Sequence, residues 1–127
     1  MTRTEKNKKK ILLVEDEPIV GRLCTRILNA EGFEVDFVPD GRMAMRAVEN
    51  TDYDLCVSDI RLPGLTGIEL YERLKENKPE LSLRMIFITG DTMNVNVRSF
   101  IQESGIPCLM KPFTPEKLVA AVKALLE

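Results

Sequence analysis

Five short apolar segments, each followed by a stretch with helical periodicity, constrain the fold of this chain more than any other feature. The segments have the length of β-strands, and the residues between them place apolar side chains every three or four positions, as in amphipathic helices. The strand-like segments cover residues 10–14, 33–38, 53–59, 84–89 and 106–110. The chain therefore reads as (βα)5, which predicts an α/β fold.

Most of the strand segments are apolar throughout, which predicts a parallel sheet covered by helices on both faces. Only residues 33–38 alternate, so we expect that strand to have one wetter face. Short loops and right-handed crossovers leave few topologies. We predict a doubly wound, five-stranded parallel sheet of the flavodoxin-like type, with strand order 2-1-3-4-5. Such a sheet binds ligands beyond the carboxyl ends of its strands.

The predicted helices have recognisable ends and apolar faces. Pro18 suits a first helical turn, Asp40 can cap a second helix, and Gly32 and Gly105 suit positions just after helices. The side chains expected on the apolar faces of the first two helices are Val20, Leu23, Cys24, Ile27 and Leu28, and then Met43, Ala44, Ala47 and Val48.

Length and charge indicate one domain with a short basic tail. The 127 residues suit a single domain. Residues 1–10 hold five of the 18 Lys and Arg but one of the 20 Asp and Glu, so the remainder carries 13 basic and 19 acidic residues. We expect residues 1–8 to be a disordered tail and residues 9–127 to be the folded domain. An acidic domain argues against direct nucleic-acid binding.

The composition also predicts where the protein works. No segment approaches the length of a membrane span, and the apolar run at residues 11–14 is too short for a secretory signal. The three cysteines show no paired spacing, so we expect reduced thiols. These features predict a cytoplasmic protein whose folded domain does not contact a membrane.

Polar residues end four of the predicted strands. Glu15 and Asp16 follow the first strand, Asp59 the third, Thr89 the fourth and Lys111 the fifth. Because parallel strands end at one edge, we expect these side chains to converge. Crowded carboxylates without His or Cys favour a hard cation, and Mg²⁺ suits a few carboxylates plus water. A carboxylate beside Mg²⁺ and an ammonium is placed to attack phosphorus.

Each of these residues also has a simpler interpretation. Asp59 could be a helix cap or a turn residue, although it precedes Pro63-Gly64 and not a helix start. The acids at 15–17 suit the start of a helix, and Lys111 before Pro112 could be a surface lysine with a buried stem. Thr89 could belong to a turn at the strand end. It is their joint placement at the strand ends that favours a site.

The motifs resemble those of response-regulator receiver domains of two-component signalling. They cover nearly all of residues 9–127, and the finer pattern is similar to receivers at the C-terminus of hybrid sensor histidine kinases. The matching segments are ILLVEDEP, DGRMAM, YDLCVSDIRLPGLTGIEL, MIFITGD and LMKPF. The chain is expected to be either a stand-alone regulator or a receiver from a longer protein.

The resemblance implies a role for each residue of the predicted site. Asp59 would accept phosphoryl from a histidine kinase or phosphotransfer protein, and Thr89 and Lys111 would contact the phosphoryl group. Mg²⁺ would be bound by Asp16, Glu15, Asp59 and the backbone carbonyl of Arg61. The Lys111–Pro112 peptide would be cis, and Thr89 would swing toward the phosphoryl group and change the conformation of the following helix and strand. The downstream partner stays open.

One position departs from the family pattern. Many receivers have Tyr or Phe three residues before the motif lysine, where its ring rotates inward on activation. This chain has Cys108 there. An aromatic switch at this site is therefore not expected, and a movement of Thr89 would be transmitted by backbone shifts around residues 90–94 or by other side chains. Met110, Phe100 or a partner residue could fill the space beside the small thiol.

Two other functions on related architectures fit less well. A phosphatase of the haloacid dehalogenase type would need a second Asp two residues after its nucleophile, where this chain has Arg61. A flavodoxin-like carrier of FMN would need a phosphate-binding loop after the first strand, where acids would repel the phosphate. We therefore predict a signalling receiver that is not an enzyme in the ordinary sense.

Overall fold

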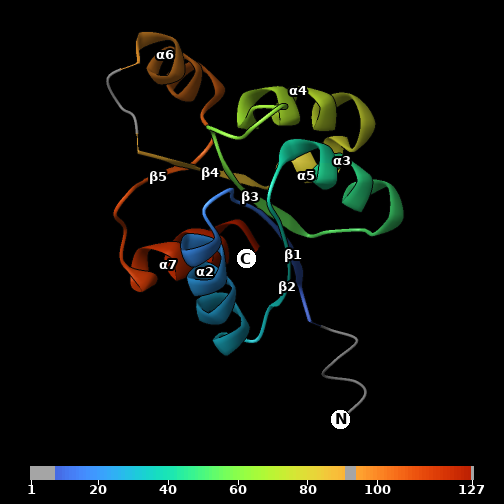
Figure 1. Ribbon diagram of the computed structural model, residues 1–127, viewed down its shortest axis with the longest axis vertical. Helices are drawn as coiled ribbons and strands as arrows, with labels where there is room; N and C mark the ends of the chain where they lie inside the picture. The colour runs from blue at the N-terminus through green and yellow to red at the C-terminus, as the bar shows by residue number, and fades with distance from the viewer. Residues whose placement is uncertain (1–7, 91–93, 127) are drawn as a thin grey trace.

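The computed structural model describes residues 8–90 and 94–126, and these form a sheet with helices on both faces (Figure 1). The ends of the predicted strands are confirmed to within two residues, and a helix follows each strand as predicted. One short helix, at residues 79–82, was not predicted. In chain order the elements are β1 (Lys10–Val14), α2 (Pro18–Ala30), β2 (Glu34–Val38), α3 (Gly41–Asn50), β3 (Leu55–Asp59), α4 (Gly67–Asn77), the short α5 (Pro79–Ser82), β4 (Met85–Thr89), α6 (Val95–Ser104), β5 (Cys108–Met110) and α7 (Pro115–Leu126).

All five strands are parallel, in the order β2-β1-β3-β4-β5, as predicted. The register pairs Val14 with Ser58, Asp59 with Ile88 and Thr89 with Met110. The polar residues that end the strands therefore lie at one edge of the sheet.

Two hydrophobic clusters fill the spaces on either side of the sheet. Helices α2 and α7 cover one face, and α3, α4 and α5 cover the other (Figure 1). Side chains of β3 and β4 alternate between the clusters: Val57 and Ile88 pack on the α2 side, and Cys56 and Phe87 on the α3 side. This two-sided burial explains why most of the strand segments are apolar throughout.

Local sequence signals set the start of two helices next to the sheet. Asp40 caps α3 by accepting the Met43 N–H at 2.8 Å. Thr66 and Glu69 form a reciprocal capping box at the start of α4. Gly67 opens that helix directly against β3, because a Cβ there would lie 2.3 Å from the carbonyl oxygen of Asp59. The absence of a side chain at Gly67 thus lets α4 begin beside the end of β3.

Helix α6 is attached differently from the others, since none of its described residues is fully buried. Its main anchor is the ring of Phe100, which packs edge-to-face on Tyr71 of α4 and on Phe87 of β4, with centroids 5.7 Å apart in both pairs. Tyr71 and Phe87 complete the trio at 6.3 Å. Phe87 is paired in register with Cys108, the position at which many receivers have Tyr or Phe. The Phe100 ring, which packs on Phe87, therefore lies near Cys108.

Two residues that fit the apolar period of their helices are not buried. Leu23 is 54% exposed and Met43 is 44% exposed. Each lies at the border of its helix's apolar stripe, and the sheet covers only the centre of that stripe. The predicted tail largely lies outside the described residues, as do residues 91–93 of the predicted switch segment. No helix in the described ranges is long and apolar enough to cross a bilayer.

Candidate functional site

The carboxyl ends of β1, β3, β4 and β5 bring the predicted site residues together. One carboxylate oxygen from each of Glu15, Asp16, Glu17 and Asp59 lies within 4.8 Å of the others. Lys111 follows β5, and its backbone N–H donates to the Thr89 carbonyl at 2.8 Å. Residues separated by up to 96 positions in the sequence therefore form one charged cluster.

Asp59 is almost fully buried, at 4% exposure, and both of its carboxylate oxygens are held. Oδ2 accepts a hydrogen bond from Lys111 Nζ at 2.8 Å, and Oδ1 accepts one from the Arg61 N–H at 2.9 Å. The carboxylate thus has a fixed orientation, which suits a nucleophile that must meet a phosphorus atom along a defined line.

Lys111 is the cation that these carboxylates share. Its Nζ lies 2.8 Å from Asp59 Oδ2, 2.8 Å from Glu17 Oε1 and 3.2 Å from Glu15 Oε1. Burial lowers the pKa of Lys111, but hydrogen bonds to Asp59 and Glu17 raise it, and the net pKa lies above its usual value. The side chain therefore stays an ammonium. The Lys111–Pro112 peptide is cis, as predicted.

Glu15 is fully buried, and its surroundings disfavour a negative charge. Burial is the main reason that its pKa rises to about 7; the Glu17 N–H opposes this rise, while the charge of Asp59 adds to it. The Glu17 N–H donates to Oε2 at 3.0 Å. Oε1 accepts no hydrogen bond from the described residues, although the Lys111 ammonium lies near it. A buried carboxylate oxygen without a hydrogen bond is a ready ligand for a cation.

These residues fit the magnesium site that the sequence predicts. Three of the four carboxylates contact the Lys111 ammonium, and the fourth, that of Asp16, is exposed. The donors are oxygens, as a hard divalent cation requires. Arg61 is placed by its N–H against Asp59, and the ligand role of its carbonyl stays a prediction.

A hollow borders the cluster on the side of Asp16. A hollow of about 480 Å³ adjoins Asp16 and Arg61 and extends between the β3–α4 loop and the start of α6, where Asn94 and Val97 line it. Thr89 is buried at 2% exposure at the end of β4. The cluster therefore meets this hollow at Asp16 and Arg61, while Thr89 lies buried behind it at the end of the strand.

One contact of the cluster, that of Glu17 with Lys111, was not predicted. In the sequence Glu17 looks like one of three acids at the start of a helix. It is the N-cap residue of α2, but its side chain makes no capping hydrogen bond. The signal in the sequence is the third consecutive acid, which the predicted metal site does not use.

The cysteines are not part of a disulfide. Burial raises the pKa of Cys24 to about 11 and that of Cys56 to about 12. Burial also raises the pKa of the partly buried Cys108, and the charge of Asp59 adds to that rise. All three are thus poor nucleophiles at neutral pH, in agreement with the expected reduced, structural thiols.

A five-stranded parallel sheet with an acidic cluster and a lysine at its carboxyl edge defines the class of CheY-like α/β signalling domains. The sequence matches the response regulator receiver domain over residues 11–123. The chain belongs to this family, as its motifs predicted.

Two relatives illustrate the match in sequence. The chain is 33% identical over 119 residues to the DNA-binding response regulator MtrA of Mycolicibacterium smegmatis, which covers 94% of this chain and 51% of MtrA. It is 39% identical over 117 residues to the transcriptional regulatory protein TcrA of Mycobacterium tuberculosis, covering 91% of this chain and 45% of TcrA. The chain thus spans about half the length of these curated relatives.

Solved structures agree on the fold. A CheY-like response regulator receiver domain from Methanospirillum hungatei superimposes with a TM-score of 0.86 at 29% identity, covering 94% of each chain. The response regulator protein TrrA from Thermotoga maritima, solved in complex with Mg²⁺-BeF, gives a TM-score of 0.81 at 30% identity, covering 92% of this chain and 98% of TrrA. The predicted flavodoxin-like topology is confirmed.

Proposed function

We propose that Asp59 accepts a phosphoryl group from a phosphohistidine of a histidine kinase or a phosphotransfer protein. An Asp59 carboxylate oxygen forms the bond to phosphorus, the phosphorus–nitrogen bond of the donor breaks, and the imidazole leaves and takes up a proton from solvent. The family is one of signalling switches, and its receivers are phosphorylated by histidine kinases.

The proposal rests on the burial and the fixed orientation of the Asp59 carboxylate. This carboxylate is buried and oriented by Lys111 and by the Arg61 N–H, yet it lies in a cluster that borders a hollow. Structural carboxylates at strand ends have no need of a shared lysine and three acidic neighbours, which raise the electrostatic cost of the fold. Reactive sites retain such costs because they perform chemistry.

Lys111 and Thr89 have supporting roles in this proposal. The Lys111 ammonium, already 2.8 Å from Asp59 Oδ2, neutralises charge on the phosphoryl oxygens. Thr89, buried next to Lys111 at the strand ends, donates its hydroxyl to one of those oxygens and moves to do so. Its movement biases α6, the helix with no fully buried residue among those described, and β5.

Glu15, Asp16, Asp59 and the carbonyl of Arg61 would hold Mg²⁺. The metal would supply positive charge against the phosphoryl oxygens. The unbonded Oε1 of buried Glu15 and the close spacing of the carboxylates support this assignment, as does the Mg²⁺ complex of TrrA. Magnesium affinity should fall by at least about tenfold in Asp16→Asn, which removes one ligand charge. Calorimetry would measure it, and an unchanged affinity would contradict the ligand assignment.

The test of the transfer itself uses small-molecule donors. The native chain, incubated with phosphoramidate or acetyl phosphate and Mg²⁺, should gain the mass of one phosphoryl group. Asp59→Ala should gain none, while Asp54→Ala, which removes an acid at the opposite end of β3, should react as the native chain does. No gain on the native chain with any donor would overturn the proposal.

The partners of the whole protein are less defined. The relatives described above are DNA-binding and transcriptional regulators, and this chain matches about half of each. The expectation that this acidic domain does not itself bind nucleic acid therefore stays a prediction about residues 9–127. Similarity to receivers of hybrid kinases and a cytoplasmic location also stay predictions.

A further inference from the structure

The Lys111 ammonium has two equally close partners, and only one of them belongs to the predicted phosphorylation machinery. Nζ lies 2.8 Å from Asp59 Oδ2 and 2.8 Å from Glu17 Oε1. An ammonium has three N–H donors, and the third points toward buried Glu15, whose Oε2 lies 3.5 Å away. All three donors of Lys111 are therefore directed at carboxylates in this state.

Glu17 reaches Lys111 because its side chain is not used by its own helix. It occupies the N-cap position of α2 in an extended conformation, with φ −91° and ψ 111°, and makes no side-chain capping bond. Its backbone is fixed on both sides, since its N–H donates to Glu15 Oε2 and its carbonyl accepts the Gly21 N–H at 2.9 Å. The carboxylate crosses from the end of β1 to the end of β5.

The three carboxylates around Lys111 differ in how easily they can release it. The side chain of Glu15 is fully buried and that of Asp59 is 6% exposed, whereas that of Glu17 is 59% exposed. Water can replace the ammonium at Glu17 at little cost, but not at the two buried oxygens. When phosphoryl oxygens require a donor from Lys111, Glu17 is the partner that gives it up.

We propose that Glu17 is a positioning residue that holds the Lys111 ammonium beside Asp59 in the resting state and competes with the phosphoryl group for it afterwards. The inference rests on the proposed function, because it assigns Lys111 to the phosphoryl group. Glu17 then weakens the phosphorylated state, and loss of its contact with Lys111 strengthens that state.

Two substitutions separate the contact from the charge. Glu17→Asp keeps the charge but is one methylene shorter and is a favoured N-cap, so the carboxylate turns to the N–H groups of α2 and leaves Lys111. Glu17→Gln keeps the length but removes the charge. The matched control is Glu116→Gln, which removes an exposed acid from the first turn of α7.

The readout is equilibrium binding of beryllofluoride with Mg²⁺, a tetrahedral anion that takes the place of a phosphoryl group, followed by ¹⁹F NMR. Both Glu17 variants should bind it about three- to fivefold more tightly than the native chain, the range that one exposed ion pair implies. Glu116→Gln should bind it with native affinity.

Three outcomes overturn the inference and leave the proposed function standing: native affinity in both Glu17 variants, tighter binding in Glu17→Gln alone, which indicates a general field effect, and equal tightening in Glu116→Gln. Failure of the proposed function is distinct from all of these. In that case the native chain binds no beryllofluoride and accepts no phosphoryl group.

Discussion

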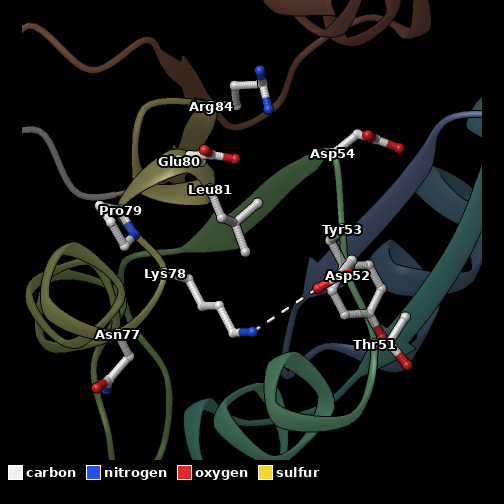
Figure 2. Close-up of a pocket in the computed structure, with 10 residues that line it drawn as sticks. All are labelled: Thr51, Asp52, Tyr53, Asp54, Asn77, Lys78, Pro79, Glu80, Leu81 and Arg84. Carbon is white, nitrogen blue, oxygen red and sulfur yellow. Dashed lines mark ion pairs between the residues drawn. The ribbon is translucent and has the colours of Figure 1, made fainter.

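The two ends of the same sheet carry similar residues in different surroundings. At the carboxyl end, Glu15 and Asp59 are buried around Lys111. At the amino end, a cavity of about 480 Å³ is lined by Asp52, Asp54, Lys78, Glu80, Arg84 and their neighbours (Figure 2). There the ion pair of Lys78 and Asp52 is long, at 3.9 Å, and the Asp52 side chain is fully exposed.

The difference shows what makes a charged cluster reactive. Water screens the charges at the amino end, so their interactions contribute little to the free energy of unfolding and hold the side chains only weakly in place. Burial at the carboxyl end strengthens every interaction among the charges and leaves them dependent on a cation. The same residue types are therefore surface groups at one end and a candidate site at the other.

The largest expected effect separates the two lysines. Lys111→Ala should slow phosphorylation by acetyl phosphate by about 100-fold, because the phosphoryl oxygens lose their ammonium. Lys78→Ala should change the rate by less than about twofold, since its charge is exposed. Mass spectrometry over time measures both rates. Similar rates for the two variants would contradict the proposal that the lysine at the carboxyl end, and not the one at the amino end, takes part in phosphorylation.

The next effect concerns pH. The folded-state pKa of Glu15 is about 7, raised from 4.5 chiefly by burial, so the folded chain keeps a proton that the unfolded chain releases. This contribution to stability is full below pH 4.5 and is lost as the pH rises through 7. In the presence of a chelator, the free energy of unfolding should fall by about 3 kcal/mol across this window.

Urea unfolding at several pH values measures this loss. Glu15→Gln should flatten the profile, because the amide does not titrate, and Glu80→Gln at the exposed amino end should retain the native slope. A native profile as flat as that of Glu15→Gln would show that the burial of Glu15 carries no such penalty.

One polar contact near the amino end of the sheet differs from the exposed charges there, because its donor is buried. The Tyr53 hydroxyl donates to Asp36 Oδ2 at 2.6 Å, and Tyr53 is 9% exposed. Tyr53→Phe should lower the free energy of unfolding by about 1.5 kcal/mol, because a charge-assisted hydrogen bond is lost from a buried position. Tyr71→Phe, which keeps its ring contacts, is the matched control in urea unfolding. Equal losses in both would mean that the contact with Asp36 is not special.

The smallest effect is expected at Asp52. Asp52→Asn breaks the ion pair with Lys78, yet the urea midpoint should not move measurably, since the carboxylate is fully exposed. A clear decrease in the midpoint would show that the amino end contributes more to stability than its exposure indicates.

Periodicity and strand ends were enough to predict most of the fold. Five apolar segments predicted the parallel sheet. Since parallel strands end at one edge, their order also predicted that Glu15, Asp59 and Lys111 would lie close together, as they do. Helix α5 was missed because its four residues are too few to show a period.

The remaining features depend on where long side chains reach, which sequence spacing does not determine. Glu17 could cap its own helix or cross to Lys111, and both are compatible with the same sequence. Leu23 fits the apolar period of α2 but lies beyond the area that the sheet covers. Such outcomes follow from the packing of the whole domain.

The aromatic trio of Tyr71, Phe87 and Phe100 gives the chain a built-in optical signal. The sequence has no Trp and two Tyr, so its near-ultraviolet circular dichroism comes from few rings. One of these two, Tyr71 of α4, packs on Phe100, the ring that anchors α6. Because this signal requires fixed packing of the rings, a displacement of α6 can be followed in solution without adding a label.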